Sequence, residues 1–314
     1  MVVLSNNDGC VIARSEESKA LGIKMGDVFY QVKDVLEKNG VAVFSSNYNL
    51  YGDMSRRVMS LLSTYTPKLD IYSIDEAFLD LTGMGDMEFL SSYCKQMVRD
   101  ITKGTGIPIS LGVAPTKTLA KMASKYAKKH KGYEGACFID TEEKREKALK
   151  LFPVEDVWGI GYRHVKKLAY HGIHTAWDLT QRSESWIRKE LTITGVRTWK
   201  ELRGESCVSI DEPPHKKSIC TSRSFSGSGL NKLADVEEAV ANFAAACSRK
   251  LREGHIVCSS VTVFAHTSRF RIDVPQNYIY RTINLVVPTN DMQELVAVAV
   301  KTLREDWKEG GFLY

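Results

Sequence analysis

Residues 71–81 have the sequence IYSIDEAFLDL, in which two adjacent carboxylates, Asp75 and Glu76, interrupt an otherwise apolar, strand-like segment. An unpaired charge in an apolar setting is costly, and a bound divalent cation is one remedy. Mg²⁺ prefers hard oxygen ligands and is typically bound by one or two carboxylates together with substrate phosphates. The alternative is a solvated hairpin tip that merely carries an Asp-Glu pair, and spacing alone leaves both open.

Residues 116–129 predict a helix with two distinct faces. One face repeats apolar residues at helical spacing and is expected to be buried: Leu119, Met122, Ala123, Tyr126 and Ala127. A second face carries only lysine: Lys117, Lys121, Lys125 and Lys128. No acidic residue occurs from Pro115 to Tyr133, so we expect this stripe to be unopposed by acids. A solvated face usually mixes both signs, so the stripe favours a polyanionic partner, although a merely soluble face is the alternative.

Residues 154–161, VEDVWGIG, predict a Gly-x-Gly hairpin between two short helices. Gly159 and Gly161 leave backbone N–H groups unblocked by side chains, and a helix N-terminus of this kind can bind one phosphate of DNA. Arg163 and Lys166 follow directly and add positive charge. The alternative is an ordinary turn between helices.

Weaker signals lie near both ends of the chain. Ser15 and Lys19 are one helical turn apart, so that Lys19 could meet a phosphate, but a single such pair carries little weight. In the last hundred residues, basic side chains lie on or beside predicted strands, as a sheet that follows a nucleic-acid backbone requires. They include Arg223, Arg269 and Arg271.

Composition excludes several classes of protein. The 314 residues are enough for about two domains, and 43% apolar and 26% charged residues are typical of a soluble globular chain. Seven scattered cysteines without a CxxC pair favour reduced thiols in a cytoplasm over a disulfide scaffold or a zinc site. No apolar run reaches the length of about twenty residues that a membrane span needs, and the opening residues do not predict an export signal. The net charge of +5 permits nucleic-acid binding without requiring it.

The order of predicted elements divides the chain. A hairpin over 2–13 turns at 7–9, and helices over 16–21, 55–62 and 88–102 alternate with strands over 69–81 and 107–113 up to residue 141. Residues 142–204 are helical, and 209–217 form a polar linker. The remaining residues predict five further elements: a strand at 219–225, a helix at 235–251 with an Asp235–Glu238 capping box, strands at 257–265 and 278–287, and a helix begun at Asp291. This is the order of a split βαβ unit that lacks its closing strand.

Together these segments resemble the Y-family translesion DNA polymerases, and most closely their UmuC-like branch. The residues that carry the resemblance are SNNDGCVIARSEESKALGIKMGD (5–27), YSIDEAFLDLTG (72–83), SLGVAPTKTLAKMASKYAKKHKG (110–132) and VEDVWGIG (154–161). The resemblance implies an α+β right-hand polymerase. Its parts would be fingers at 1–47, a palm at 48–141, a helical thumb with a helix-hairpin-helix at 142–208, a linker at 209–217 and a little finger at 218–314.

The resemblance also assigns roles. Asp75 would bind two catalytic Mg²⁺ ions and Glu76 the one at the primer 3′-hydroxyl, while Lys19 and Lys128 would contact the incoming triphosphate. Ile12 and Ala13 would line the fingers beneath the nascent pair, close to Ser15. Duplex-backbone contacts would come from the glycines of the thumb hairpin, the lysine stripe and the little finger. Primer-template DNA and deoxynucleoside triphosphates would be the substrates, and a UmuD-type subunit, a RecA filament and a sliding clamp the implied partners.

Relatives carry an aspartate, a carbonyl ligand and an aromatic gate in a strand that precedes the one resembled by residues 2–4. That strand, the closing strand of the little finger and the clamp-binding tail are not in this sequence. Asp8 lies in a predicted turn and is not expected to replace the aspartate. Two hypotheses result: an error-prone polymerase of the SOS-repair type that transfers nucleotides opposite damaged template with two metals, or a catalytically impaired chain that still binds DNA.

Overall fold

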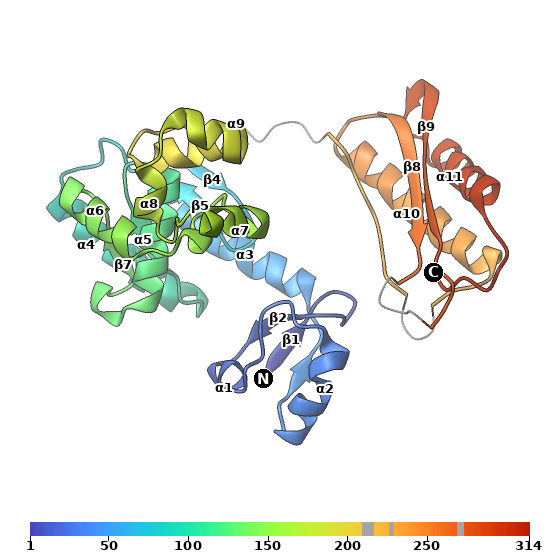
Figure 1. Cartoon of the computed structure of the whole chain (residues 1–314), viewed down its shortest axis with the longest axis horizontal. Coiled ribbons are helices and arrows are strands. Elements are labelled where there is room, and N and C mark those ends of the chain that lie inside the picture. The colour runs from blue at the N-terminus through green and yellow to red at the C-terminus, as the bar shows by residue number, and fades with distance from the viewer. Residues whose placement is uncertain (209–216, 226–228, 269–272) are drawn as a thin grey trace. The chain divides into compact units, whose positions relative to one another are not determined.

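The computed structural model describes residues 1–208, 217–225, 229–268 and 273–314. It divides into two compact units, one comprising Asn47–Pro213 and the other Met1–Ser46 together with Pro214–Tyr314. The described residues contain both helices and strands (Figure 1), which confirms the expected α+β class. In the described part of the chain, no helix is long and apolar enough to cross a membrane.

The first forty-six residues build a small three-stranded sheet around their own core. Strand β1 (Val2–Leu4) pairs antiparallel with β2 (Val11–Arg14) and parallel with β3 (Val43–Phe44), and Asp8 has φ 52° at the turn of the predicted hairpin. Helix α1 (Glu16–Ala20) follows as predicted. Helix α2 (Phe29–Lys38) was not predicted, although Phe29, Val32 and Leu36 recur at helical spacing and pack in this core.

The Asn47–Pro213 unit begins with two packed helices. Helix α3 (Tyr48–Leu62) starts earlier than predicted because the Asn47 side chain accepts a hydrogen bond of 3.1 Å from the Leu50 N–H and so caps it. Helix α4 (Met87–Thr105) is capped by Asp86 and ends at Gly106, which has a left-handed φ of 73°. Its residues Met97 and Ile101 pack against Val58, Met59 and Leu62 of α3, and Leu90 and Cys94 are also buried.

Short strands in this unit form separate pairs. Strand β4 (Leu69–Ile71) pairs antiparallel with β5 (Ala77–Leu79), and β6 (Leu111–Val113) pairs parallel with β7 (Ala136–Phe138). The strand predicted over 107–113 is therefore confined to its last three residues. In the described residues the first seven strands form three sheets, of three, two and two strands.

Helix α5 (Lys117–Lys129) lies directly on β6 because Gly112 has no side chain. A Cβ atom at Gly112 would lie 1.9 Å from the Ala120 carbonyl oxygen and 2.2 Å from the Ser124 nitrogen. The predicted apolar face of α5 is confirmed: Leu119, Met122, Ala123 and Ala127 are buried, with Tyr126 packed beside them. Burial raises the pKa of Tyr126 to about 12, and its hydroxyl donates to the Ala148 carbonyl at 2.8 Å.

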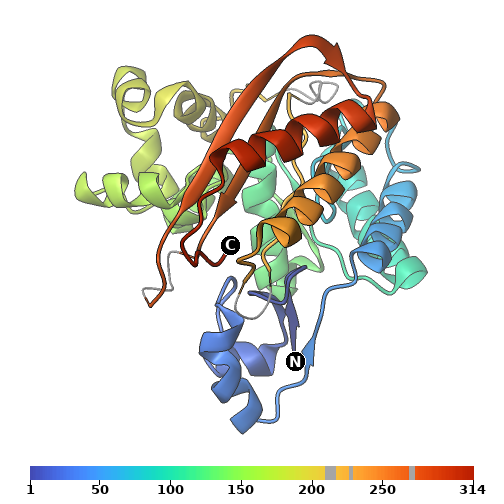
Figure 2. The same ribbon diagram turned by 90° about the vertical axis from the view of Figure 1, so that its right-hand side faces the viewer.

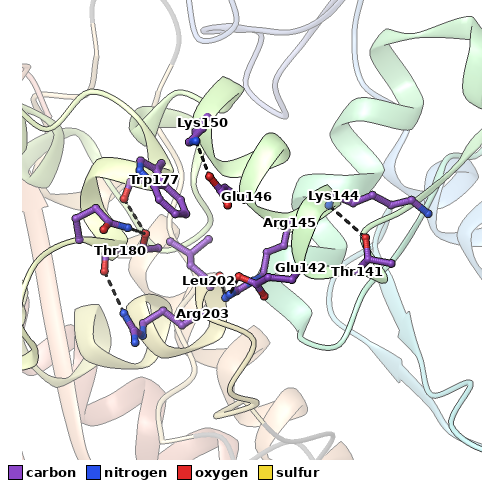
Figure 3. A network of polar contacts seen from close by, with 11 residues as sticks. Thr141, Glu142, Lys144, Arg145, Glu146, Lys150, Trp177, Thr180, Leu202 and Arg203 are labelled. Atoms are coloured by element: carbon purple, nitrogen blue, oxygen red, sulfur yellow. Dashed lines mark hydrogen bonds and ion pairs between the residues drawn. The ribbon is translucent and has the colours of Figure 1, made fainter.

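Helices follow as predicted over 142–204. They are α6 (Glu142–Leu151), the 3₁₀ helix η2 (Val154–Asp156), α7 (Tyr162–Tyr170), α8 (Ala176–Thr180) and α9 (Glu184–Leu202), and they share one apolar core with α5. Polar contacts tie three of them together (Figure 3). Arg145 on α6 donates to the Leu202 carbonyl at the end of α9 at 3.2 Å, and Arg203 donates to the Thr180 carbonyl of α8 at 3.3 Å.

The last segment contains two long helices and a two-stranded antiparallel sheet. Helices α10 (Leu233–Glu253) and α11 (Met292–Asp306) run side by side (Figure 2), and α11 packs on both β8 (Cys258–His266) and β9 (Tyr278–Thr289). The predicted helix start at Asp291 is confirmed, since the Asp291 carboxylate accepts from the Gln293 and Glu294 N–H groups and caps α11.

Two expectations for this segment are wrong. Residues 219–225 form no strand, because they make none of the ladder hydrogen bonds that β8 and β9 make with each other. The Asp235–Glu238 capping box does not form either: α10 begins at Leu233, so Asp235 lies inside the first turn, where it still favours the positive end of the helix dipole.

Candidate active site at the β4–β5 hairpin

Asp75 and Glu76 lie at the tip of the β4–β5 hairpin. Asp70 pairs with Phe78 and Ile71 with Ala77 in the ladder, and the Tyr72 and Ser73 N–H groups both donate to the Glu76 carbonyl at 3.0 Å. The Asp75 carboxylate accepts a hydrogen bond of 2.6 Å from the Ser73 hydroxyl. Both acidic residues are exposed, so the turn presents two hard oxygen donors to solvent.

Asp80, the third acidic residue within 71–81, has partners of its own. Hydrogen bonds from Thr82 hold the pKa of the Asp80 carboxyl below its usual range, and Lys68 lies 3.6 Å away. Asp80 therefore stabilises the turn after β5 and is separate from the tip.

The lysine stripe of α5 faces this hairpin, and the expectation that no acid opposes it is wrong. Lys117 pairs with Asp70 at 2.7 Å, and Lys121 pairs with Glu76 at 2.8 Å. One turn further on, Lys125 pairs with Asp156 of η2. The acids were missed because all three come from other elements of the chain. Lys128, by contrast, is exposed at the end of the helix, and no carboxylate pairs with it among the described residues.

Three aromatic rings join the hairpin to the loop before α7. Trp158 meets Tyr72 edge to face, with centroids 5.4 Å apart and planes at 88°, and its centroid lies 5.7 Å from that of Phe78. Lysines of the stripe lie over these rings: Lys117 is 4.9 Å from the Phe78 centroid, and Lys121 is 5.2 Å from Tyr72 and 5.3 Å from Trp158. Sequence patterns gave no sign of this cluster, because nothing in the local spacing relates residue 158 to residue 72.

The donor chemistry of the tip fits a divalent cation. Carboxylate oxygens on an exposed turn suit Mg²⁺, and the Lys121 ammonium beside Glu76 shows that this position already favours positive charge. Within the described ranges, however, no group of three or more His, Cys, Asp or Glu side chains is arranged to hold a metal ion. Asp75 and Glu76 would therefore bind a metal together with ligands from elsewhere, such as substrate phosphates.

The predicted Gly-x-Gly hairpin has the expected local geometry. Gly159 has φ 92°, which favours glycine, and Gly161 is the N-cap of α7. Arg163 and Lys166 are exposed on the first turns of α7, and the Lys166 ammonium lies 4.6 Å from the centroid of Tyr162. An α-helix N-terminus with exposed basic residues has the features of a phosphate-binding site.

The remaining predicted residues lie outside the Asn47–Pro213 unit. Ile12 and Ala13 are on β2; Ser15 precedes α1 and its hydroxyl accepts from the Met1 amino group at 2.8 Å; and Lys19 pairs with Glu16 at 2.5 Å. Asp8 accepts a hydrogen bond from Ser45. Arg223 is exposed, whereas Arg269 and Arg271 lie outside the described residues.

Comparison with solved structures identifies the class of fold. The chain superposes on a Y-family DNA polymerase chimera, Dbh-Dpo4(243-245)-Dbh, with a TM-score of 0.76 and 19% identity, covering 97% of this chain and 86% of the other. DinB from Sulfolobus solfataricus gives a TM-score of 0.57 and 20% identity, with 97% and 85% covered. The fold is therefore that of the Y-family DNA polymerases.

Sequence relatives identify the family. The impB/mucB/samB family matches residues 1–125, and the C-terminal domain of that family matches residues 216–313. Protein UmuC of Salmonella typhimurium is 42% identical over 99% of this chain and 74% of its own length, and Protein MucB of Escherichia coli is 37% identical over 98% and 73%. The chain belongs to the impB/mucB/samB family, which confirms the UmuC-like resemblance.

Proposed function

We propose that this chain is a DNA-directed DNA polymerase of the translesion type, which uses Asp75 and Glu76 to hold two Mg²⁺ ions. The observation that carries the proposal is the β4–β5 hairpin, which presents both carboxylates at an exposed tip beside the cationic face of α5. The fold of the Y-family polymerases and 42% identity to UmuC support it. Ternary complexes of the structurally similar polymerase Dbh support binding of DNA and a nucleotide.

The proposal gives a role to several of the predicted residues. Bound Mg²⁺ would acidify the primer 3′-hydroxyl and neutralise charge on the transferring phosphoryl group. Asp75 and Glu76 would supply the carboxylate ligands of the bound Mg²⁺. Lys128, exposed at the end of α5, would contact the incoming triphosphate. The α7 N-terminus with Arg163 and Lys166 binds a backbone phosphate of the duplex.

Extension of a labelled primer tests the proposal. With Mg²⁺ and deoxynucleotides, we expect synthesis on an intact template and past an abasic site, and we expect Asp75→Ala to abolish both. The Asp80→Asn variant is the matched control, because Asp80 belongs to the same stretch but stabilises the turn after β5. Absence of extension by the wild-type chain, or extension by Asp75→Ala at the wild-type rate, would refute the assignment.

A second candidate function is DNA binding without nucleotide transfer. It is favoured by the arrangement of the tip, where the described residues bring no third His, Cys, Asp or Glu side chain to Asp75 and Glu76 for a metal. In that case we expect affinity for primer-template DNA that falls steeply with salt, because phosphate contacts release counterions, and no extension under any metal condition. A UmuD-type subunit, a RecA filament and a sliding clamp remain proposed partners, to be sought by co-purification.

A further inference from the structure

Glu76 already has a cationic partner in this fold. The Lys121 ammonium lies 2.8 Å from Glu76 Oε2, and the Lys121 side chain is only 23% exposed. The lysines one turn before and one turn after it pair with other acids, Asp70 and Asp156. Three consecutive lysines of this face therefore each have their own carboxylate, and the partner of Glu76 is Lys121.

Aromatic rings hold the Lys121 ammonium in place. It lies over Tyr72 and Trp158 at 5.2 and 5.3 Å from their centroids, where the negative ring faces attract a cation. Tyr72 is four residues from Glu76 on the same hairpin, whereas Trp158 precedes Gly159 in the loop that leads to α7. The ammonium thus contacts both the acidic tip and the loop that carries the predicted phosphate site.

We propose that Lys121 is a positioning residue: its ammonium is the counter-ion of Glu76 in the metal-free chain, and a divalent cation that binds Glu76 displaces it. This inference rests on the proposed role of Glu76 as a metal ligand. Two cations at one carboxylate repel each other, so the lysine lowers the affinity of the site for a free metal ion. Once displaced, the ammonium no longer has the same contact with Trp158, so that metal binding alters the environment of the loop before α7.

Binding of Mn²⁺ to the full chain without DNA tests this, measured from the free-ion signal in electron paramagnetic resonance. Lys121→Met removes the charge and keeps an apolar stem against the two rings. We expect it to tighten Mn²⁺ binding about three- to tenfold, which is the range expected from removing one like charge at a partly exposed site. Lys129→Met, which removes a charge from the exposed end of the same helix, is the matched control and should change the affinity less than twofold.

Two further variants assign the effect. In a Glu76→Gln background, Lys121→Met should no longer tighten binding, because the shared carboxylate is gone. Titration with Mg²⁺ should change tryptophan fluorescence in the wild-type chain and not in Trp158→Phe. Circular dichroism confirms that each variant is folded, and Lys121→Gln replaces Lys121→Met if the latter is not.

The outcomes separate this inference from the proposed polymerase. Unchanged or weaker Mn²⁺ binding by Lys121→Met, or no binding by any variant, overturns the inference even when the wild-type chain extends primers. Tighter binding that depends on Glu76 supports the inference even when no primer is extended, in which case only the polymerase assignment fails.

Discussion

Glu201, fully buried near the end of α9, accepts a hydrogen bond of 2.9 Å from the Thr118 N–H in the first turn of α5. Its other oxygen accepts from the Cys207 and Val208 N–H groups at 2.7 and 3.1 Å, and its carbonyl accepts from the Thr116 hydroxyl. A carboxylate at a helix N-terminus is favoured by the helix dipole. This contact fixes the start of the helix that carries the lysine stripe.

Replacing Glu201 with Ala should therefore destabilise the Asn47–Pro213 unit. The buried Thr118 N–H and the half-buried Cys207 and Val208 N–H groups would lose their acceptor, and we expect a loss of about 2–4 kcal/mol in the free energy of unfolding. Urea denaturation measures it. Glu205→Ala is the control, because Glu205 is exposed, lies 3.7 Å from Lys200 and should cost less than about 1 kcal/mol. Equal losses of unfolding free energy for the two variants would contradict a stabilising role for the hydrogen bonds of the Glu201 carboxylate.

Gly112→Ala should also be destabilising, for a steric reason. The added Cβ would meet backbone atoms of α5, which cannot move as a flexible side chain can, and we expect a cost of about 2 kcal/mol or more. Gly52→Ala on α3 is the matched control: nothing lies within 4 Å of its Cβ position, and alanine favours a helix interior by about 0.5–1 kcal/mol. Thermal melts of the two variants should shift in opposite directions.

The seven cysteines should differ sharply in reactivity. Burial raises the pKa of the Cys94 thiol to about 11, and Cys94 is fully buried on α4, whereas Cys220 is exposed. The thiolate is the reactive form, and at pH 8 almost all of Cys94 is protonated. Iodoacetamide followed by peptide mass spectrometry should modify Cys220 first and Cys94 only after denaturation. Early labelling of Cys94 in the native chain would contradict the burial of this thiol on α4.

Stability of the last segment should depend on pH through Glu237. The hydrogen-bonded Arg304 guanidinium holds the pKa of the Glu237 carboxyl below its usual range, with contacts of 2.6 and 2.8 Å between α10 and α11. Because the pKa of Glu237 is lower in the folded state than in the unfolded state, the ion pair stabilises the folded state at pH values above the unfolded-state pKa. This stabilisation is lost as the pH falls through the folded-state pKa. Glu237→Gln should therefore lower the Tm at pH 6 but not near pH 3. A Tm difference that is the same at both pH values would argue against the ion pair.

Lys128→Ala should weaken nucleotide use more than DNA binding. Lys128 is exposed at the end of α5 and is the member of the stripe proposed to contact the triphosphate. We expect KM for deoxynucleotide to rise about tenfold, the loss of one charge-assisted contact, while affinity for primer-template DNA changes little. Lys131→Ala, two residues past the helix, controls for general loss of positive charge. A selective loss of DNA affinity in Lys128→Ala would assign this residue to the duplex instead.

Sequence patterns predicted most of the local structure that positions the site. The strands within 69–81, the apolar face of α5, the Gly-x-Gly turn and the helix start at Asp291 follow from near-neighbour rules of spacing, turn and capping chemistry. An exposed hairpin tip at Asp75 and Glu76 was one of the two alternatives that these rules left open. The same rules failed where a choice depended on distant partners. Residues 219–225 have a strand-like composition but no ladder partner among the described residues.

The sequence by itself determined which residues could do chemistry: adjacent carboxylates on a turn, lysines on one helical face, and glycines before a helix. These are properties of neighbours within a few positions along the chain, where geometry is fixed by the backbone. Only the tertiary structure decided the partners: Glu76 pairs with Lys121, Asp156 pairs with Lys125, and Trp158 packs against Tyr72. Those pairings join residues 31 to 86 positions apart, and packing of the buried face of α5 into the core, rather than any local signal, brings them together.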